Sequence, residues 1–314
     1  MIRRIMASAF ITHPDCLKHE MGAWHPERPE RLTAIEDQLI ASGLGQHLAR
    51  YEAPLATDEQ LARVHPLEYV RAIRDAAPAS GTVHLDPDTA MNPHTLHASL
   101  RAAGAAVLAT DLVMRGEADS AFCSVRPPGH HACRARPMGF CIFNNVAVAA
   151  RHARHAHGVE RVAIIDFDVH HGNGTEEIFQ NDPHVLMAST FQHPFYPYSG
   201  TEDPAPNMIN VPLAAGAGTR QFREAVVESW IPALDGFKPQ LVLFSAGFDA
   251  HAEDDMAMLR FSDADYAWVT EQVKAVADRH AGGRMVSTLE GGYALSALGR
   301  SVVQHLRVMA GLAG

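Results

Sequence analysis

Short runs of apolar and β-branched residues alternate along the chain with longer amphipathic stretches. This alternation predicts strands that are joined by crossover helices. The strands are predicted at residues 5–11, 119–125, 161–167, 184–190, 240–246 and 284–289. The helices are predicted at residues 28–42, 66–77, 93–115, 144–157, 219–235, 262–281 and 295–311. The pattern is therefore that of an α/β protein.

Runs such as RVAIID and QLVLFS are apolar at both sets of alternating positions. Strands of this kind are covered on both faces, as they are in parallel sheets. The sequence therefore predicts a three-layer α/β/α sandwich around a central, mostly parallel sheet. It contains no internal repeat, and its Pro-dense loop at 193–212 has a length that serves a binding site more often than a domain boundary. We expect a single domain over residues 1–314.

The charge balance narrows the range of partners. The chain carries 36 acidic and 26 basic residues, a formal charge of −10, which offers no face for nucleic acid or anionic lipid and suits a cationic substrate. No apolar run approaches the roughly 18 residues of a membrane span, and the basic start lacks a convincing cleavage signal. We therefore expect a cytoplasmic protein without nucleic acid or membrane partners.

The cysteines predict no particular site, whereas the histidines do. The four cysteines form no CxxC pair, so neither a disulfide framework nor a thiolate metal site is predicted, and a reducing compartment is expected. Histidine occurs 20 times, with adjacent pairs at His130-His131 and His170-His171. This clustering calls for a chemical explanation. By contrast, His152, His155 and His157 lie beside arginines on a predicted amphipathic helix, where a solvated polar face is expected.

Possible metal ligands follow two of the predicted strands. Asp166, Asp168 and His170 come after RVAII, and Asp249 comes after QLVLFSA. In open parallel sheets, ligands bind beyond the carboxyl ends of the strands. Asp168, His170 and Asp249 can therefore hold one ion and leave a position open for water; Zn²⁺ is the commonest choice for such ligands, and Fe²⁺ or Co²⁺ fits the same set. The alternative is that each residue caps a helix or closes a turn.

A second cluster, RPPGHHA, presents His130 and His131 on a loop that two prolines and a glycine make rigid. One imidazole can take a proton from the attacking water and return it to a leaving amine, while the other stabilises charge. Asp166 and Asn173 are available as partners. An imidazole bonded to the aspartate would favour the charged form, and one bonded to the asparagine would stay closer to neutral. An isolated pair of histidines would more often decorate the surface.

Two further segments complete the predicted site. In LEGGY, two glycines let the backbone approach the site, so that Tyr293 can polarise a substrate carbonyl and share the oxyanion with the metal; a turn at a helix entry is the alternative. Gly139 and Phe140 lie on a loop that can form one wall of a narrow channel. Phe195 and Tyr196 of the Pro-dense loop can supply the opposite wall, although either aromatic pair can also be ordinary core.

The segments RPPGHHA, GFCIFNN, DFDVHHGNG, SAGFDAH and LEGGY, in this order, resemble the histone deacetylases and their bacterial relatives in the arginase–deacetylase superfamily. HPERPERL near the start is similar to the entrance loop of that family, so the resemblance covers about residues 25 to 300. It implies the arginase–deacetylase fold and a zinc-dependent amidohydrolase.

The resemblance also implies roles for individual residues. Asp168, His170 and Asp249 would be the zinc ligands, His131 the general base and acid, and Tyr293 the residue that polarises the carbonyl. His130 would be the electrostatic companion of His131, with Asp166 as its partner. A structural potassium ion is implied near Asp166, Asp168, His170, Ser189 and Thr190.

Features that differ within the family bear on the branch and the substrate. Asn173 stands where class I members carry aspartate, so the chain resembles class II and His131 should be a weaker base. The residue that gates the channel aligns with Met256, whereas polyamine-specific members carry an acid there. The acidic run Glu253-Asp254-Asp255 leaves this placement open by one or two residues. Asp88 is a candidate for the rim residue that binds the substrate backbone.

The resulting hypothesis is a deacetylase that hydrolyses ε-N-acetyl-lysine in a peptide or protein to acetate and a free amine. Hydrolysis of acetylpolyamines or of another small N-acyl amide is the alternative. A binuclear manganese ureohydrolase would need a second ligand set, which the sequence does not provide. A protein that only binds acetylated ligands would be expected to lack the histidine pair or Tyr293. The sequence predicts no oligomeric state.

Overall fold

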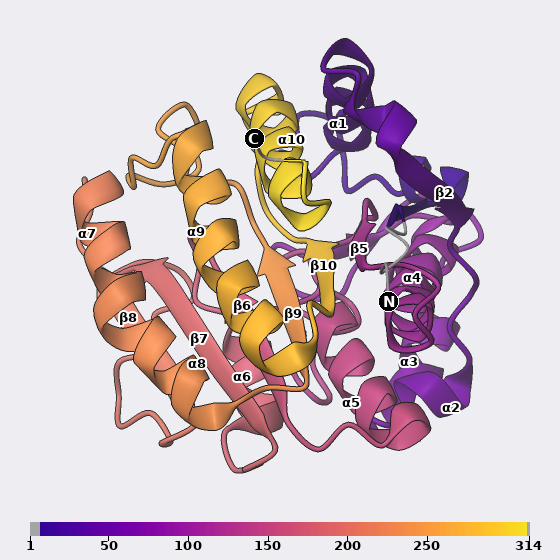
Figure 1. Ribbon diagram of the computed structural model, residues 1–314. Helices are drawn as coiled ribbons and strands as arrows, with labels where there is room; N and C mark the ends of the chain where they lie inside the picture. The colour runs from indigo at the N-terminus through magenta and orange to yellow at the C-terminus, as the bar shows by residue number, and fades with distance from the viewer. Residues whose placement is uncertain (1–6, 313–314) are drawn as a thin grey trace.

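The computed structural model describes residues 7–312, and a parallel sheet of eight strands lies at its centre (Figure 1). Its strands are β1 (Ser8–Thr12), β2 (Leu48–Glu52), β5 (Ser120–Cys123), β6 (Val162–Asp166), β7 (Val185–Gln192), β8 (Met208–Leu213), β9 (Leu241–Ala246) and β10 (Met285–Leu289). Their order is β2-β1-β5-β10-β9-β6-β7-β8, and every neighbouring pair is parallel. β3 (Val83–His84) and β4 (Ala90–Met91) form a separate antiparallel sheet of two strands.

Helices cover both faces of the sheet, which confirms the predicted three-layer sandwich (Figure 1). On one face, α10 (Leu295–Met309) packs between α1 (Glu30–Ala41) and α9 (Asp263–Val276). On the other face, α4 (Thr95–Met114) packs against α5 (Asn145–His157). The remaining α-helices are α2 (Asp58–Leu61), α3 (Leu67–Ala76), α6 (Asn173–Phe179), α7 (Thr219–Ala225) and α8 (Ile231–Phe237). Single π-helical turns at Val226–Trp230 and Ala277–Ala281 follow α7 and α9.

The central strands are the ones that the sequence predicts best. All five residues of β6 and all six of β9 are buried, because helices cover both faces of the sheet there. The edge strands β2 and β8 are partly exposed, and the sequence analysis did not predict them. The Pro-dense segment is therefore not loop throughout, since its last part forms β8. Residues 5–6 of the first predicted strand lie outside the described residues.

The start of α5 is tied to the loop that carries the two adjacent histidines. Asn144 caps the helix by accepting a hydrogen bond from the amide of Ala147. The side-chain amide of Asn144 also donates to the carbonyl of Ala132 and to the hydroxyl of Thr175. One buried asparagine thus fixes both the helix and the end of the histidine loop. Because all strands of the sheet are parallel, the loops after β5, β6, β9 and β10 meet at one edge.

Stability should fall as the pH drops from about 6.5 to 4, because His65 is buried in its neutral form. Its Nδ1 donates to the carbonyl of Arg134, and its Nε2 accepts from the amide of Asn144. Burial lowers the pKa of His65 to about 4, below the value of about 6.5 in the unfolded chain. As the pH falls, the unfolded state therefore takes up a proton before the folded state does. The stabilisation that comes from burying neutral His65 is complete above pH 6.5 and is lost toward pH 4.

The measurement is urea denaturation at several pH values for the wild type and for His65→Gln. Between pH 6.5 and 4, the free energy of unfolding should fall by about 1.4 kcal/mol more per pH unit in the wild type than in the variant. Equal pH dependence of the two proteins would contradict the prediction.

Candidate active site

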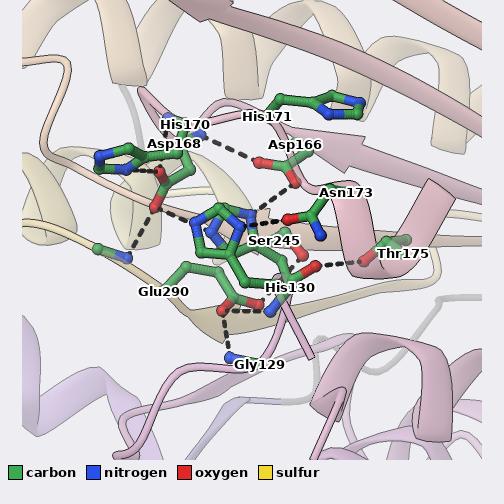
Figure 2. Close-up of polar contacts among 12 residues, drawn as sticks. Gly129, His130, Asp166, Asp168, His170, His171, Asn173, Thr175, Ser245 and Glu290 are labelled. Atoms are coloured by element: carbon green, nitrogen blue, oxygen red, sulfur yellow. Dashed lines mark hydrogen bonds and ion pairs between the residues drawn. The ribbon is translucent and has the colours of Figure 1, made fainter. Parts of the chain in front are cut away.

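Three of the predicted metal ligands come together beyond the carboxyl ends of β6 and β9. Asp168 and His170 lie in the loop after β6, and Asp249 follows β9; all three side chains are buried. Their ligand atoms lie within 4.8 Å of one another. The Nδ1 atom of His170 is 2.9 Å from Oδ1 of Asp168 and 3.3 Å from Oδ2 of Asp249. Figure 2 shows Asp168 and His170 side by side.

The surroundings of these ligands fit a bound cation. Oδ2 of Asp168 accepts from the amide of Gly291, and Oδ1 of Asp249 accepts from the amide of Val169. Oδ2 of Asp249 is buried and accepts no hydrogen bond. A buried carboxylate oxygen without a partner is costly unless a cation or a proton neutralises it. Two carboxylates and one imidazole with no thiolate form a ligand set for a divalent cation.

Two glycines leave the room that these carboxylates need. A Cβ atom on Gly247 would overlap the carboxylate of Asp168, and a Cβ atom on Gly291 would overlap that of Asp249. The glycines after β9 and β10 therefore allow the backbone to pass directly beside the ligands.

The two adjacent histidines have the two different partners that were predicted. Nδ1 of His130 is 3.0 Å from Oδ2 of Asp166 (Figure 2). Nδ1 of His131 is 2.7 Å from Oδ1 of Asn173. Both histidines are buried, and their ring centroids are 4.0 Å apart. The Nε2 atom of His130 is 3.8 Å from Oδ2 of Asp168, so the histidine pair lies next to the metal ligands.

These partners separate the charges of the two imidazoles. Burial disfavours charge on His130, but the carboxylates of Asp168 and Asp166 outweigh it and raise the pKa of His130 to about 10. Burial lowers the pKa of His131 well below 6.5, and the charges of His130 and His170 lower it further. At neutral pH, His130 is therefore an imidazolium and His131 a neutral base.

A cavity of about 140 Å³ opens from this cluster toward the surface. It is lined by Asp88, Pro128, His130, His131, Gly139, Phe140, His170, Phe195, Tyr196, Met256, Gly291 and Tyr293. The lining thus contains all five residues that were predicted for the channel, together with Tyr293.

The walls of the cavity are aromatic and tightly packed. The ring of Phe195 stacks on that of His170 with centroids 5.4 Å apart, and the ring of Tyr196 lies 5.3 Å from that of His131. Phe140 meets Tyr293 edge to face at 6.2 Å. Gly139 has φ +57°, and a Cβ atom there would overlap the ring of His131, so only glycine fits this wall.

Met256 lines the cavity, whereas Glu253, Asp254 and Asp255 do not. Asp254 is buried and accepts hydrogen bonds from the amides of Tyr293 and Ala294, at 2.6 and 2.9 Å. Glu253 pairs with Arg300 at the surface. Asp88 is the only carboxylate among the described residues that line the cavity, and its Oδ1 accepts from the amide of Gly139.

The model of the histone deacetylase domain matches residues 25–309. The chain belongs to the histone deacetylase family. It is 40% identical over 295 residues to a histone deacetylase-like amidohydrolase of Pseudomonas aeruginosa, an alignment that covers 89% of this chain and 77% of that protein. It is 35% identical over 328 residues to the polyamine deacetylase HDAC10 of Homo sapiens, covering 98% of this chain and 48% of the human protein.

The solved structure of the HDA15 HD domain is similar to this chain with a TM-score of 0.92 and 34% sequence identity, covering 98% of this chain and 90% of that one. The family and its members indicate a hydrolase with deacetylase activity. None of the helices within residues 7–312 combines the length and the apolar character that a bilayer crossing requires.

The histidines on α5 differ from the sequence prediction. His152 is buried rather than solvated, and its Nε2 lies 2.8 Å from Oδ1 of Asp111, with Nε2 of His157 at 2.6 Å from the same oxygen. These three residues form another group with converging ligand atoms in this deacetylase. However, Arg63 binds Nδ1 of His152, so hydrogen bonds satisfy the group without a metal. His155 is exposed, as predicted.

Two residues make contacts in the deacetylase site that were not predicted from the sequence. Asp254 holds the backbone of Tyr293, and Glu290 accepts hydrogen bonds from the histidine loop. Both are acidic residues inside motifs that the sequence analysis noted. Their sequence positions alone do not reveal which amide groups they bind, because these amides lie on distant segments.

Proposed function

We propose that this deacetylase uses one zinc ion to hydrolyse ε-N-acetyl-lysine in peptides or proteins. The observation that carries the proposal is the narrow, aromatic cavity that is lined by His131, Tyr293 and His170, the last of which groups with Asp168 and Asp249 as a possible metal ligand. An aliphatic stem suits such walls, and the amide at its tip would reach the polar end. The family resemblance and the geometry together support the proposed residue roles.

Each of these groups has a separate role in the proposed reaction. A divalent cation bound by Asp168, His170 and Asp249 would polarise the carbonyl and activate the attacking water. His131, neutral at pH 7, takes the proton of that water and passes it to the leaving amine. Burial raises the pKa of Tyr293 well above 10, so its hydroxyl stays protonated and donates to the carbonyl oxygen. His130 remains charged and stabilises negative charge that develops beside it.

A potassium ion is proposed behind the zinc site. The hydroxyl oxygens of Ser189 and Thr190 are buried and have no hydrogen-bond partner. Both residues lie on β7, whose Ser189 pairs in register with Asp166. The orphaned hydroxyl of Ser189, on the same face of the sheet as the buried carboxylate of Asp166, suits a cation with oxygen ligands, as expected for the potassium site of Asp166, Asp168, His170, Ser189 and Thr190.

The test is turnover by the zinc-loaded protein of an acetyl-lysine peptide and of N-acetylputrescine, side by side. The peptide should be the better substrate, and Tyr293→Phe should lower its turnover about 10²- to 10³-fold, as expected for the loss of an oxyanion donor. Preference for N-acetylputrescine would support the polyamine alternative. Turnover of neither substrate would overturn the proposal and point to another acyl group.

Met256→Glu should shift the preference toward N-acetylputrescine. The methionine is the gate residue that lines the cavity, and a carboxylate there would attract the second amine of a polyamine. The ratio of kcat/KM for the two substrates should change by roughly tenfold, which corresponds to about 1.4 kcal/mol. Met256→Gln is the matched control, because it has the size of glutamate without its charge. An equal shift in both variants would contradict the charge argument.

Zinc binding should release about one proton at pH 7. Burial disfavours the charged form of His170, but the hydrogen bond to Asp168 and the negative charges of Asp168 and Asp249 outweigh it and raise the pKa of this imidazole to about 9. The ring must lose its proton to bind a metal, so the affinity should fall roughly tenfold for each pH unit below that pKa. Calorimetry in buffers of different ionisation enthalpy counts the protons. A zinc affinity that is independent of pH between 6 and 8 would contradict this prediction.

A further inference from the structure

Glu290 is a fully buried carboxylate beside the site that the proposed reaction does not use. It directly follows β10, and its side chain points into the loop that carries the two histidines (Figure 2). Its Oε2 atom accepts from the amides of Gly129 and His130, at 2.6 and 3.1 Å. Its Oε1 atom accepts from the hydroxyl of Ser245 at 3.1 Å. The hydroxyl of Thr288 lies 3.4 Å from Oε1 and donates to the carbonyl of Phe244 at 3.2 Å.

We propose that Glu290 is a positioning residue that holds His131 at the correct distance from the metal ligands and Tyr293; this role rests on the proposed function. Two backbone amides and the hydroxyl of Ser245 converge on this one side chain, and a carboxylate has the acceptor oxygens that all three donors need. Two of these donors are backbone amides of the histidine loop, so the position of the loop depends on the carboxylate.

The backbone that follows Glu290 also contacts the proposed metal site. The next residue along the chain, Gly291, donates its amide to Oδ2 of the metal ligand Asp168, at 2.8 Å. Tyr293 follows two residues later. The stretch from Glu290 to Tyr293 therefore binds the loop that carries His131, donates to a metal ligand and ends in the proposed carbonyl donor Tyr293; its contact with the loop is made by the carboxylate of Glu290.

The opposite end of the histidine loop has separate support. The amide of Thr175 donates to the carbonyl of His130, and Asn144 binds the carbonyl of Ala132. Loss of the carboxylate would therefore release one side of the loop without unfolding it. A displacement of about 1 Å at a reacting group can cost about 10²-fold in rate.

The first experiment compares Glu290→Ala with Glu290→Gln on the acetyl-lysine peptide. The glutamine keeps one carbonyl oxygen for the amides of Gly129 and His130, and its amide can donate to Ser245. We expect kcat to fall about 10²-fold in the alanine variant and less than about fivefold in the glutamine variant, with KM and zinc content unchanged in both. Ser245→Ala is the control that removes one donor but leaves the loop contacts, and it should cost at most about fivefold.

A double-mutant cycle with His131→Ala separates positioning from general damage. If Glu290 acts through His131, then Glu290→Ala should lower kcat by less than about threefold once His131 is already alanine. Additive losses would overturn the proposal, because they would mean that the carboxylate acts independently of the base. Loss of zinc in the alanine variant would overturn it as well.

Hydrogen exchange tests the contact even if the protein hydrolyses neither substrate. Exchange of the segment 126–132, followed by mass spectrometry, should be faster in Glu290→Ala than in the wild type and close to the wild type in Glu290→Gln. Unchanged protection in the alanine variant would refute the positioning role. Selective loss of protection without wild-type turnover would instead refute only the proposed substrate.

Discussion

Replacing Asp249 with alanine should empty the metal site and reduce turnover to the level of protein treated with a chelator. The proposed zinc ion has three protein ligands, and only two would remain. The change would also deprive the amide of Val169 of its acceptor. Elemental analysis of the purified variant should find no bound zinc, whereas the wild type should bind one zinc ion at this site.

The matched control is Asp255→Ala, which removes an exposed carboxylate from the loop that follows the same strand. This variant should keep both its zinc and its activity, because Asp255 does not line the cavity. Full zinc content and turnover in the Asp249 variant would show that the ion, or the reaction, depends on other residues.

Replacing His131 with alanine should lower kcat by about 10²- to 10⁴-fold, the usual cost of losing a general acid–base group. Its imidazole is neutral, lines the cavity proposed for the substrate and has its tautomer set by Asn173. The variant should retain zinc, and KM should change little, because the lost interaction belongs to proton transfer. Steady-state kinetics together with zinc analysis measures both quantities.

Two further variants serve as a control and a comparison for this result. His155→Ala changes an exposed histidine of α5 and should behave as the wild type. His130→Ala removes the charged member of the pair and should also cost activity, because the imidazolium beside Asp168 would be lost. A loss of less than tenfold in His131→Ala would assign the proton transfer to another group.

The elements that the sequence predicted well are those whose physics is local. The central strands are continuous apolar runs, and Asp168, His170 and Asp249 follow their ends, so parallel pairing alone brings them to one edge. The partners of the two histidines were also predicted, because Asp166 and Asn173 flank the ligand motif. Their catalytic roles remain predictions that the variants above will test.

The features that the sequence did not reveal depend on distant contacts or on partial exposure. β2 and β8 are partly exposed edge strands, and most of β8 lies within the Pro-dense segment that was predicted to be a loop. His152 was expected in solvent, yet α4 lies beside α5 and supplies Asp111 as its partner. The role proposed for Glu290 depends on amides that precede it by more than a hundred residues.

The central place of β10 constrains how the protein can be synthesised. Before this strand emerges from the ribosome, the sheet can exist only as two separate halves, one that ends at β5 and one that ends at β9. Each half would present an unpaired strand edge, which is prone to associate with other chains. The C-terminal part of the protein therefore joins the halves and brings Tyr293 to the site in the same event. Nascent chains should need chaperone protection until that late step is complete.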